Sequence, residues 1–178
     1  MLIERKWAMP SKWTFTIKPI KEYLDMVLPN YDTIVEPFTG MCGRGTITND
    51  LNPSTPAMYH MNAVDFLKMF DECSIDCVLN DPPYSLEQIK RSYNNVGIES
   101  IGDDSKHFYS QLRDEISRIL KPNGCAITFG YSSNGIGLTR GFIMDYIMLI
   151  AHGGNHYDTI MTVEYKNKKE VTIKERWW

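Results

Sequence analysis

The sequence has no apolar run of the roughly 18 residues that a membrane-spanning helix needs. Its first residues, MLIERKWAMPSKW, carry charges where a signal peptide would be apolar, so we expect no secretion. Cysteine is scarce: the chain holds Cys42, Cys73, Cys77 and Cys125. Neither these nor the four histidines have metal-ligand spacing, so no metal site is predicted. Reduced, mostly buried thiols favour a cytoplasmic location.

Positive charge is scarce in the middle of the chain. Residues 31–87 carry two basic residues against nine acidic ones, whereas residues 1–30 and 166–178 carry five basic residues each. The formal net charge is -3 at pH 7, the opposite of the usual sign for a nucleic-acid-binding protein. Basic ends around an acidic middle would let a polyanion contact one face while a cationic cofactor occupies the other. Charged ends that are simply solvated explain the pattern equally well.

Repeats, low-complexity segments and linker-like composition are absent, so we expect one domain over residues 1–178. Apolar runs and alternation predict strands at residues 33–38, 46–50, 75–80, 125–130, 146–151 and 159–165. Helical spacing of apolar residues predicts helices at residues 63–71 and 108–120, and the polar residues 85–106 are expected to form a long loop. This α/β alternation predicts a mostly parallel twisted sheet with helices on both faces and a C-terminal antiparallel hairpin at its edge.

The glycines after the first predicted strand lack the signatures of phosphate binders. Residues 40–46 contain no lysine followed by serine or threonine, which excludes a P-loop, and no dinucleotide spacing precedes a helix. A nucleotide ligand without a pyrophosphate suits this turn better, which disfavours a dinucleotide-dependent oxidoreductase. Asp50, at the end of the second predicted strand, would accept ribose hydroxyls, and Asp65 beside Phe66 would suit an adenine. Taken alone, each acid is more often a solvent-facing residue or a helix cap.

Asp81-Pro82-Pro83-Tyr84 directly follows the apolar run Ile75–Asn80, and the two prolines end the strand there. An exocyclic amino group on a nucleic-acid base is a poor nucleophile, because its lone pair is conjugated into the ring. The Asp81 carboxylate can accept one of its N–H groups and the Pro82 carbonyl the other, while Tyr84 offers a face for the base. The alternative is a turn that is stiff for structural reasons only.

These segments resemble motifs of the DNA amino-methyltransferases, over roughly residues 12–165. Asp81–Tyr84 resembles their catalytic motif, Glu36–Gly40 their cofactor motif, and Lys12–Thr16 the motif that leads their first helix. The resemblance implies a Rossmann-like methyltransferase fold, S-adenosylmethionine as cofactor, and methylation of adenine N6 in DNA, because aspartate at position 81 is similar to the adenine enzymes. It also implies the catalytic residues Asp81, Pro82, Pro83 and Tyr84. The implied cofactor-binding residues are Trp13, Phe15, Thr16, Glu36, Pro37, Phe38, Gly40, Asp50, Asp65 and Phe66.

No segment is long enough to form a separate target-recognition domain, so we expect residues 85–107 to contact the substrate. The candidate nucleic-acid-binding residues in this stretch are Lys90, Arg91, Tyr93 and Lys106. A surface loop without specific contacts is the alternative for each of them. A homodimer or a partner subunit would be another source of target recognition. Because a base inside a duplex must be flipped out, a mismatch or a single strand is favoured as substrate. The small size and the lack of a recognition domain favour a prokaryotic source, or a viral one with the protein in the host cytoplasm.

Three alternatives to adenine N6 in DNA stay open. Within the same chemistry they are cytosine N4 in DNA and an amino group in structured RNA. From a different class, the chain would be a catalytically silent subunit that binds nucleic acid or a partner. Intact Asp81 and Tyr84 argue against a silent subunit, and failure to bind S-adenosylmethionine would favour it.

Overall fold

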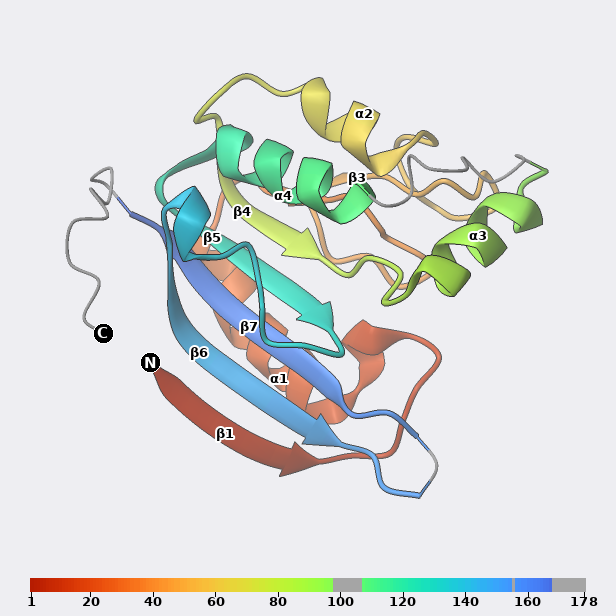
Figure 1. Ribbon diagram of the computed structural model, residues 1–178, viewed down its shortest axis with the longest axis vertical. Helices are drawn as coiled ribbons and strands as arrows, with labels where there is room; N and C mark the ends of the chain where they lie inside the picture. Colours follow the sequence, from red (N-terminus) through yellow and green to blue (C-terminus); the bar gives the residue numbers. More distant parts are fainter. Residues whose placement is uncertain (98–106, 155, 168–178) are drawn as a thin grey trace.

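The computed structural model describes residues 1–97, 107–154 and 156–167, and their strands form one seven-stranded sheet (Figure 1). The strand order is β1-β6-β7-β5-β4-β2-β3. The strands are β1 Leu2–Trp7, β2 Ile34–Glu36, β3 Ile47–Thr48, β4 Ile75–Asn80, β5 Leu120–Gly130, β6 Phe142–Ala151 and β7 Thr159–Lys166. The helices are α1 Lys18–Val27, α2 Ala63–Lys68, α3 Leu86–Asn95 and α4 Phe108–Ile119, with short 3-10 turns at Thr14–Thr16, Leu28–Asn30 and Leu138–Arg140. Each helix among these residues is too short or too polar to cross a membrane.

The predicted fold class is confirmed. Strand β7 runs antiparallel to β5 and to β6, and the other neighbouring strands in the sheet are parallel. One detail of the prediction is wrong, since the β6–β7 hairpin does not form the edge. β7 is inserted between β5 and β6, and β1 pairs with the outer side of β6. The N-terminal strand thus covers the backbone groups that the hairpin would otherwise expose.

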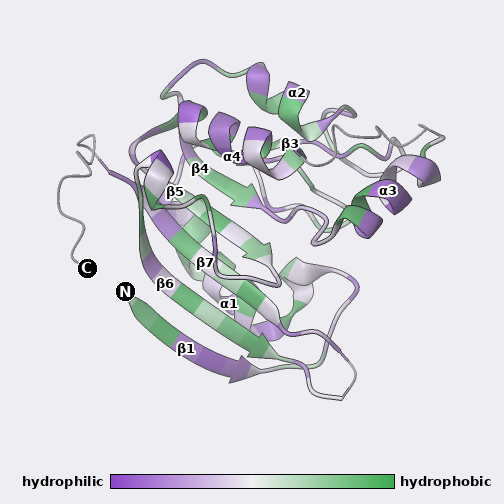
Figure 2. Cartoon of the chain, viewed as in Figure 1, coloured by the Kyte–Doolittle hydropathy of each residue, from purple (hydrophilic) through white to green (hydrophobic). Residues whose placement is uncertain are grey.

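The central strands are buried on both faces, which explains their continuous apolar runs. In β4, Cys77 and Leu79 join the core layer that contains Ile20 and Leu24 of α1, whereas Val78 joins the layer under α2 and α4. Figure 2 shows the apolar colouring concentrated along β5, β6 and β7 and polar residues on the outer helix surfaces. Helices on both sides therefore hold the sheet as a rigid platform for the loops at its ends.

Residues 86–95 form helix α3, so the long loop that we expected over residues 85–106 is wrong for this part. The Ser85 hydroxyl caps the helix by accepting from Gln88 N at 3.2 Å, and Ile89 and Tyr93, one turn apart, are both buried. Residues 98–106 lie outside the described residues. Every other predicted helix and strand overlaps one in the structure, while β1 and α1 were not predicted.

The four cysteines are all free thiols. Cys77 and Cys125 are buried on neighbouring strands, Cys42 is half-buried and Cys73 is exposed. The expectation of mostly buried thiols therefore holds for two of the four.

The carboxyl ends of β2, β4, β5 and β6 lie at the same edge of the sheet (Figure 1). The chain leaves these ends through the glycine turn after Glu36, the turn Asp81–Tyr84, the segment that begins at Tyr131 and the loop between β6 and β7. In open α/β sheets, ligands bind beyond this edge. The fold thus brings segments far apart in sequence to one place.

Candidate active site

A cavity of about 620 Å³ opens at this edge of the sheet, a volume within the range of small-molecule sites. Most of the sequence-predicted site residues line it: Trp13, Phe15, Pro37, Phe38, Gly40, Asp50, Asp81, Pro82, Pro83, Tyr84 and Tyr93. Six others do not line it: Thr16, Glu36, Asp65, Phe66, Lys90 and Arg91. Lys106 lies outside the described residues. The catalytic and cofactor segments inferred from the sequence are therefore parts of one cavity.

Gly40, in the glycine turn, lies against both Asp50 and Trp13. Gly40 has φ of +55°, a conformation in which a side chain is strained, and a Cβ there would lie 3.3 Å from the Trp13 ring. The Gly40 N–H donates to Asp50 Oδ2 at 2.8 Å. The second Asp50 oxygen accepts from Asn52 N at 2.8 Å. These bonds fix the Asp50 carboxylate beside the glycine turn at the wall of the cavity.

Glu36 is fully buried beside the glycine turn rather than facing the cavity. Its Oε2 accepts from Arg44 N at 2.7 Å and from Gly45 N at 2.6 Å. Burial raises the pKa of this carboxyl to about 7, against the lowering effect of the two backbone N–H groups. Glu36 therefore shapes the turn by holding its second half against the end of β2.

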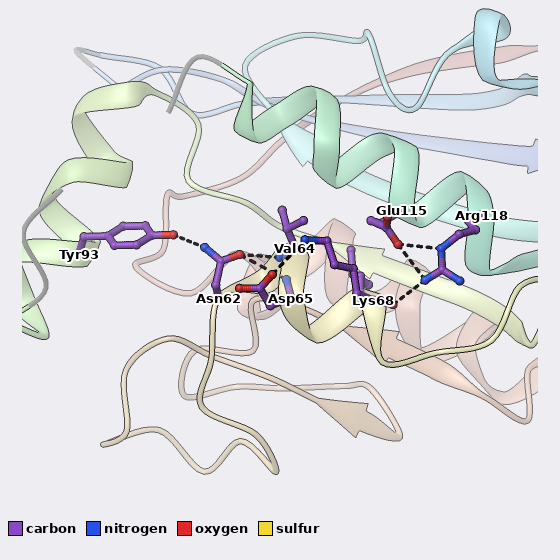
Figure 3. A network of polar contacts seen from close by, with 8 residues as sticks. Asn62, Val64, Asp65, Lys68, Tyr93, Glu115 and Arg118 are labelled. Carbon is purple, nitrogen blue, oxygen red and sulfur yellow. Dashed lines mark hydrogen bonds and ion pairs between the residues drawn. The ribbon is translucent and has the colours of Figure 1, made fainter. Parts of the chain in front are cut away.

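At the start of α2, Asn62 lines the cavity and Asp65 does not. Figure 3 shows the polar contacts that both side chains make. Asn62 Oδ1 caps the helix by accepting from Val64 N at 2.8 Å, and its Nδ2 donates to the Tyr93 hydroxyl at 2.5 Å. Asp65 lies on the exposed side of the helix, 3.1 Å from Lys68. Asn62 was missed in the sequence, although an asparagine directly before an apolar helical run is a start signal.

Phe66 was expected beside an adenine, but its ring is completely buried. It packs edge-on against Phe70, with ring centroids 5.2 Å apart, and against Tyr59. Its contribution is therefore to the core under α2.

Asp81 begins the turn after β4, and its carboxylate is held by Tyr84. The Tyr84 hydroxyl donates to Asp81 Oδ1 at 2.6 Å and lies 3.5 Å from the Thr14 hydroxyl. Burial raises the pKa of Asp81 to about 6, with the Tyr84 and Thr14 hydroxyls opposing this shift. The carboxylate is therefore mostly ionised at neutral pH and acts as a hydrogen-bond acceptor inside the cavity.

Two side chains from helices hold the proline turn in place. The Tyr109 hydroxyl of α4 donates to the Pro83 carbonyl at 2.6 Å. Gln88 of α3 accepts from Tyr84 N at 2.6 Å through its Oε1. Within the described parts of the chain, no hydrogen bond engages the Pro82 carbonyl. The turn is thus fixed on both sides of an acceptor that remains available to a ligand.

The cation candidates of α3 lie away from the cavity. Lys90 and Arg91 are exposed, and Arg91 lies 3.6 Å from Glu87 on the same helix. Tyr93 of the same helix is buried at the cavity wall, where it accepts from Asn62. Only Tyr93 of these three therefore reaches the space that a ligand would fill.

Several cavity residues were not predicted, because they carry no recognised motif and come from the end of β5, the loop between β6 and β7, and the start of β7. They are Tyr131, His152, His156, Tyr157 and Thr159. His152 is buried with Nδ1 2.9 Å from the Ala8 carbonyl and Nε2 2.9 Å from Thr159 Oγ1. Its two ring nitrogens join three chain segments, which is a structural role.

The sequence matches no known protein-family model, and no curated protein is significantly similar to it. Solved structures are similar in fold. TrmN from Thermus thermophilus superposes with a TM-score of 0.54 at 16% identity, over 84% of this chain and 49% of that one. N-methyltransferase NodS from Bradyrhizobium japonicum WM9 superposes with a TM-score of 0.52 at 10% identity, over 85% of this chain and 96% of that one.

A third similar structure is the 1,6-didemethyltoxoflavin-N1-methyltransferase of Burkholderia thailandensis with bound 1,6-didemethyltoxoflavin and S-adenosylhomocysteine. Its TM-score is 0.53 at 12% identity, over 85% of this chain and 78% of that one. This chain spans about half the length of TrmN and most of the length of the other two. It has the Rossmann-like fold of these methyltransferases.

Proposed function

We propose that this chain is an S-adenosylmethionine-dependent methyltransferase that methylates the N6 amino group of adenine in DNA. The observation that carries the proposal is the position of the Asp81 carboxylate. It faces the same cavity as the glycine turn and Asp50, and its pKa of about 6 leaves it mostly ionised at neutral pH. The shared methyltransferase fold supports the reaction class. The likeness of Asp81–Tyr84 to the adenine-type motif supports the substrate.

The residues around the glycine turn suit S-adenosylmethionine, a nucleoside without a pyrophosphate. The absence of a side chain at Gly40 lets a ligand approach the backbone closely, beside the Trp13 ring. Asp50 carries acceptor oxygens for ribose hydroxyls, and Asn62 and Tyr93 form the wall where an adenine ring would lie. When bound, this cofactor supplies an electrophilic methyl group on a sulfonium centre.

Asp81 and Pro82 would act on the amino group that receives the methyl. One N–H donates to Asp81 and the other to the Pro82 carbonyl, which turns the nitrogen lone pair away from the base ring. The nitrogen held in this way would accept the methyl group, with the neutral thioether S-adenosylhomocysteine as the leaving group, and would then lose a proton to solvent. Tyr84 and Tyr109 keep both acceptors in place through their bonds to Asp81 and Pro83.

The first test combines cofactor binding with methyl transfer. We expect S-adenosylmethionine to bind in calorimetry, and its labelled methyl to appear in adenine-containing single-stranded DNA and not in a strand that lacks adenine. In Asp81→Asn, transfer should fall by about a hundredfold or more, the usual cost of losing one group that stabilises a transition state. Its cofactor affinity should stay within a few-fold of wild type. Loss of cofactor binding in Asp81→Asn would contradict the assigned role.

A further inference from the structure

Three tyrosines from separate segments form a continuous row that leads out of the cavity. Tyr84 follows β4, Tyr131 follows β5, and Tyr157 lies in the loop between β6 and β7. The ring centroids of Tyr84 and Tyr131 are 4.8 Å apart, and those of Tyr131 and Tyr157 are 5.1 Å apart. All three rings line the cavity. The row therefore connects the partner of Asp81 to the molecular surface.

Exposure of the rings increases along the row. Tyr84 is half-buried, Tyr131 is 43% exposed and Tyr157 is 78% exposed. Hence most of the Tyr157 ring is not used to pack the core. Adjoining exposed aromatic rings at the mouth of a cavity are typical of a binding surface, because their faces remain available to a flat ligand.

Gln88 fixes the inner part of the row to the proline turn. Its Oε1 accepts from Tyr84 N at 2.6 Å, and its Nε2 lies 3.4 Å from the Tyr131 hydroxyl as donor. Gln88 thus fixes the positions of the Tyr84 and Tyr131 rings relative to Asp81. A ligand on Tyr131 would therefore have a defined position relative to the reacting group.

Positive charge is sparse in the cavity that the row lines. In the described lining of the cavity, Lys12 is the one lysine or arginine, and it lies 4.8 Å from the centre of the Trp13 ring. Duplex binding depends on many contacts between cations and phosphates. Binding of an unpaired strand can instead rely on stacking of bases on aromatic rings, which tolerates any sequence.

We propose that the Tyr84–Tyr131–Tyr157 row binds an unpaired nucleic-acid strand, with the target base at Tyr84 and the neighbouring bases stacked on Tyr131 and Tyr157. The inference rests on the proposed function for the identity of the target base only. It explains how a chain of net charge -3 binds a polyanion. It also makes a single strand, or a locally opened duplex, the substrate form.

Fluorescence anisotropy with a short labelled DNA strand tests the row directly. Tyr131→Ala and Tyr157→Ala should each weaken binding of the single strand about fivefold to a hundredfold, the effect of losing one base–aromatic stack. Tyr157→Phe keeps the ring and should bind as wild type does. Tyr131→Phe keeps the ring but loses the Gln88 contact, so it should bind with an affinity between those of wild type and Tyr131→Ala. Met26→Ala, at an exposed site on α1, controls for general surface effects.

The form of the ligand and its salt dependence complete the test. The single strand should bind more tightly than its duplex, with a shallow slope of log affinity against log salt of about -1, and an RNA strand that depends on the same rings would also support the row. Tighter duplex binding with a steep salt slope, unchanged affinity in both alanine variants, or no binding of any strand would overturn it.

Failure of this inference and failure of the proposed function are distinguishable. A strand that binds through the rings and receives no methyl group leaves the row in place and contradicts the proposed function. If a strand is methylated at adenine and binds equally well to both alanine variants, the proposed function stands and the role of the tyrosine row is contradicted.

Discussion

The hydroxyl of Tyr84 donates a 2.6 Å hydrogen bond to Asp81 Oδ1. This bond links the two ends of the proline turn, so the carboxylate cannot rotate without moving the tyrosine ring. It also stabilises a charge that burial disfavours, since burial raises the pKa of Asp81 to about 6. The Tyr84 bond thus fixes the direction of the acceptor that the proposed reaction uses and favours its ionised form against burial.

The rate of methyl transfer should depend on the ionisation of Asp81. Because a protonated carboxyl loses acceptor capacity, kcat/KM should fall about tenfold per pH unit below pH 6 and level off above it. A pH–rate profile with single-stranded DNA measures this.

Glu36, whose pKa is raised to about 7, is the other buried carboxyl near the site. Glu36→Gln keeps an oxygen for the two backbone N–H groups, so it should retain the acidic limb of the profile. If the fall in kcat/KM at acidic pH disappears in Glu36→Gln, the group that must be ionised for transfer is Glu36 and not Asp81.

Asp81→Asn should make the protein more stable at neutral and alkaline pH. A carboxyl whose pKa is raised on folding favours the folded state fully below its unfolded pKa, and this contribution is lost as pH rises through the folded value of about 6. Removing the charge therefore has little effect near pH 4 and stabilises at pH 8, by up to about 3 kcal/mol. Thermal unfolding at both pH values measures the difference.

Asp65→Asn is the matched control for this stability effect, because Asp65 is an exposed acid paired with Lys68. Its melting temperature should differ little from wild type at either pH. An Asp81→Asn variant that is no more stable than wild type at pH 8 would show that burying the charged carboxylate does not reduce the free energy of unfolding.

Asp50→Ala should weaken S-adenosylmethionine binding about tenfold or more, since hydrogen bonds between a carboxylate and hydroxyls are charge-assisted. Asp65→Ala should leave the affinity unchanged, because Asp65 lies outside the cavity. Calorimetric titration of both variants compares them. Weaker binding in Asp65→Ala with unchanged binding in Asp50→Ala would reverse the two assignments.

Tyr109→Phe should lower kcat about three- to tenfold, the cost of one neutral hydrogen bond, because the Pro83 carbonyl loses its 2.6 Å partner. Tyr109 acts on the turn and does not line the cavity of Asp81. The cofactor dissociation constant should therefore stay as in wild type. A loss confined to folding stability, with kcat intact, would assign Tyr109 a purely structural role.

Strand β4 could be predicted at its observed bounds because the apolar run Ile75–Asn80 ends at two prolines, which fix the boundary locally. Strand β1 could not, because Leu2–Trp7 is exposed along most of its length and carries no alternation of buried and exposed residues. Its place depends on pairing with β6, more than a hundred residues away in the chain.

The candidate site was predictable where a motif carries the chemistry, as at Asp81–Tyr84 and Gly40. The choice between Asn62 and Asp65 was not, since the two lie within one helical turn and only the direction of α2 decides which faces the cavity. The tyrosine row was also hidden, because Tyr84, Tyr131 and Tyr157 meet only when β4, β5 and the β6–β7 loop end at the same edge.

Transfer of labelled methyl from S-adenosylmethionine to single-stranded DNA, duplex DNA and RNA, followed by nucleoside analysis, tests the proposed function most directly. We predict label in N6-methyladenine from DNA, most strongly from the single strand, and its loss in Asp81→Asn. Label confined to RNA or to cytosine, or no label from a chain that binds the cofactor, would contradict adenine N6 in DNA as the substrate.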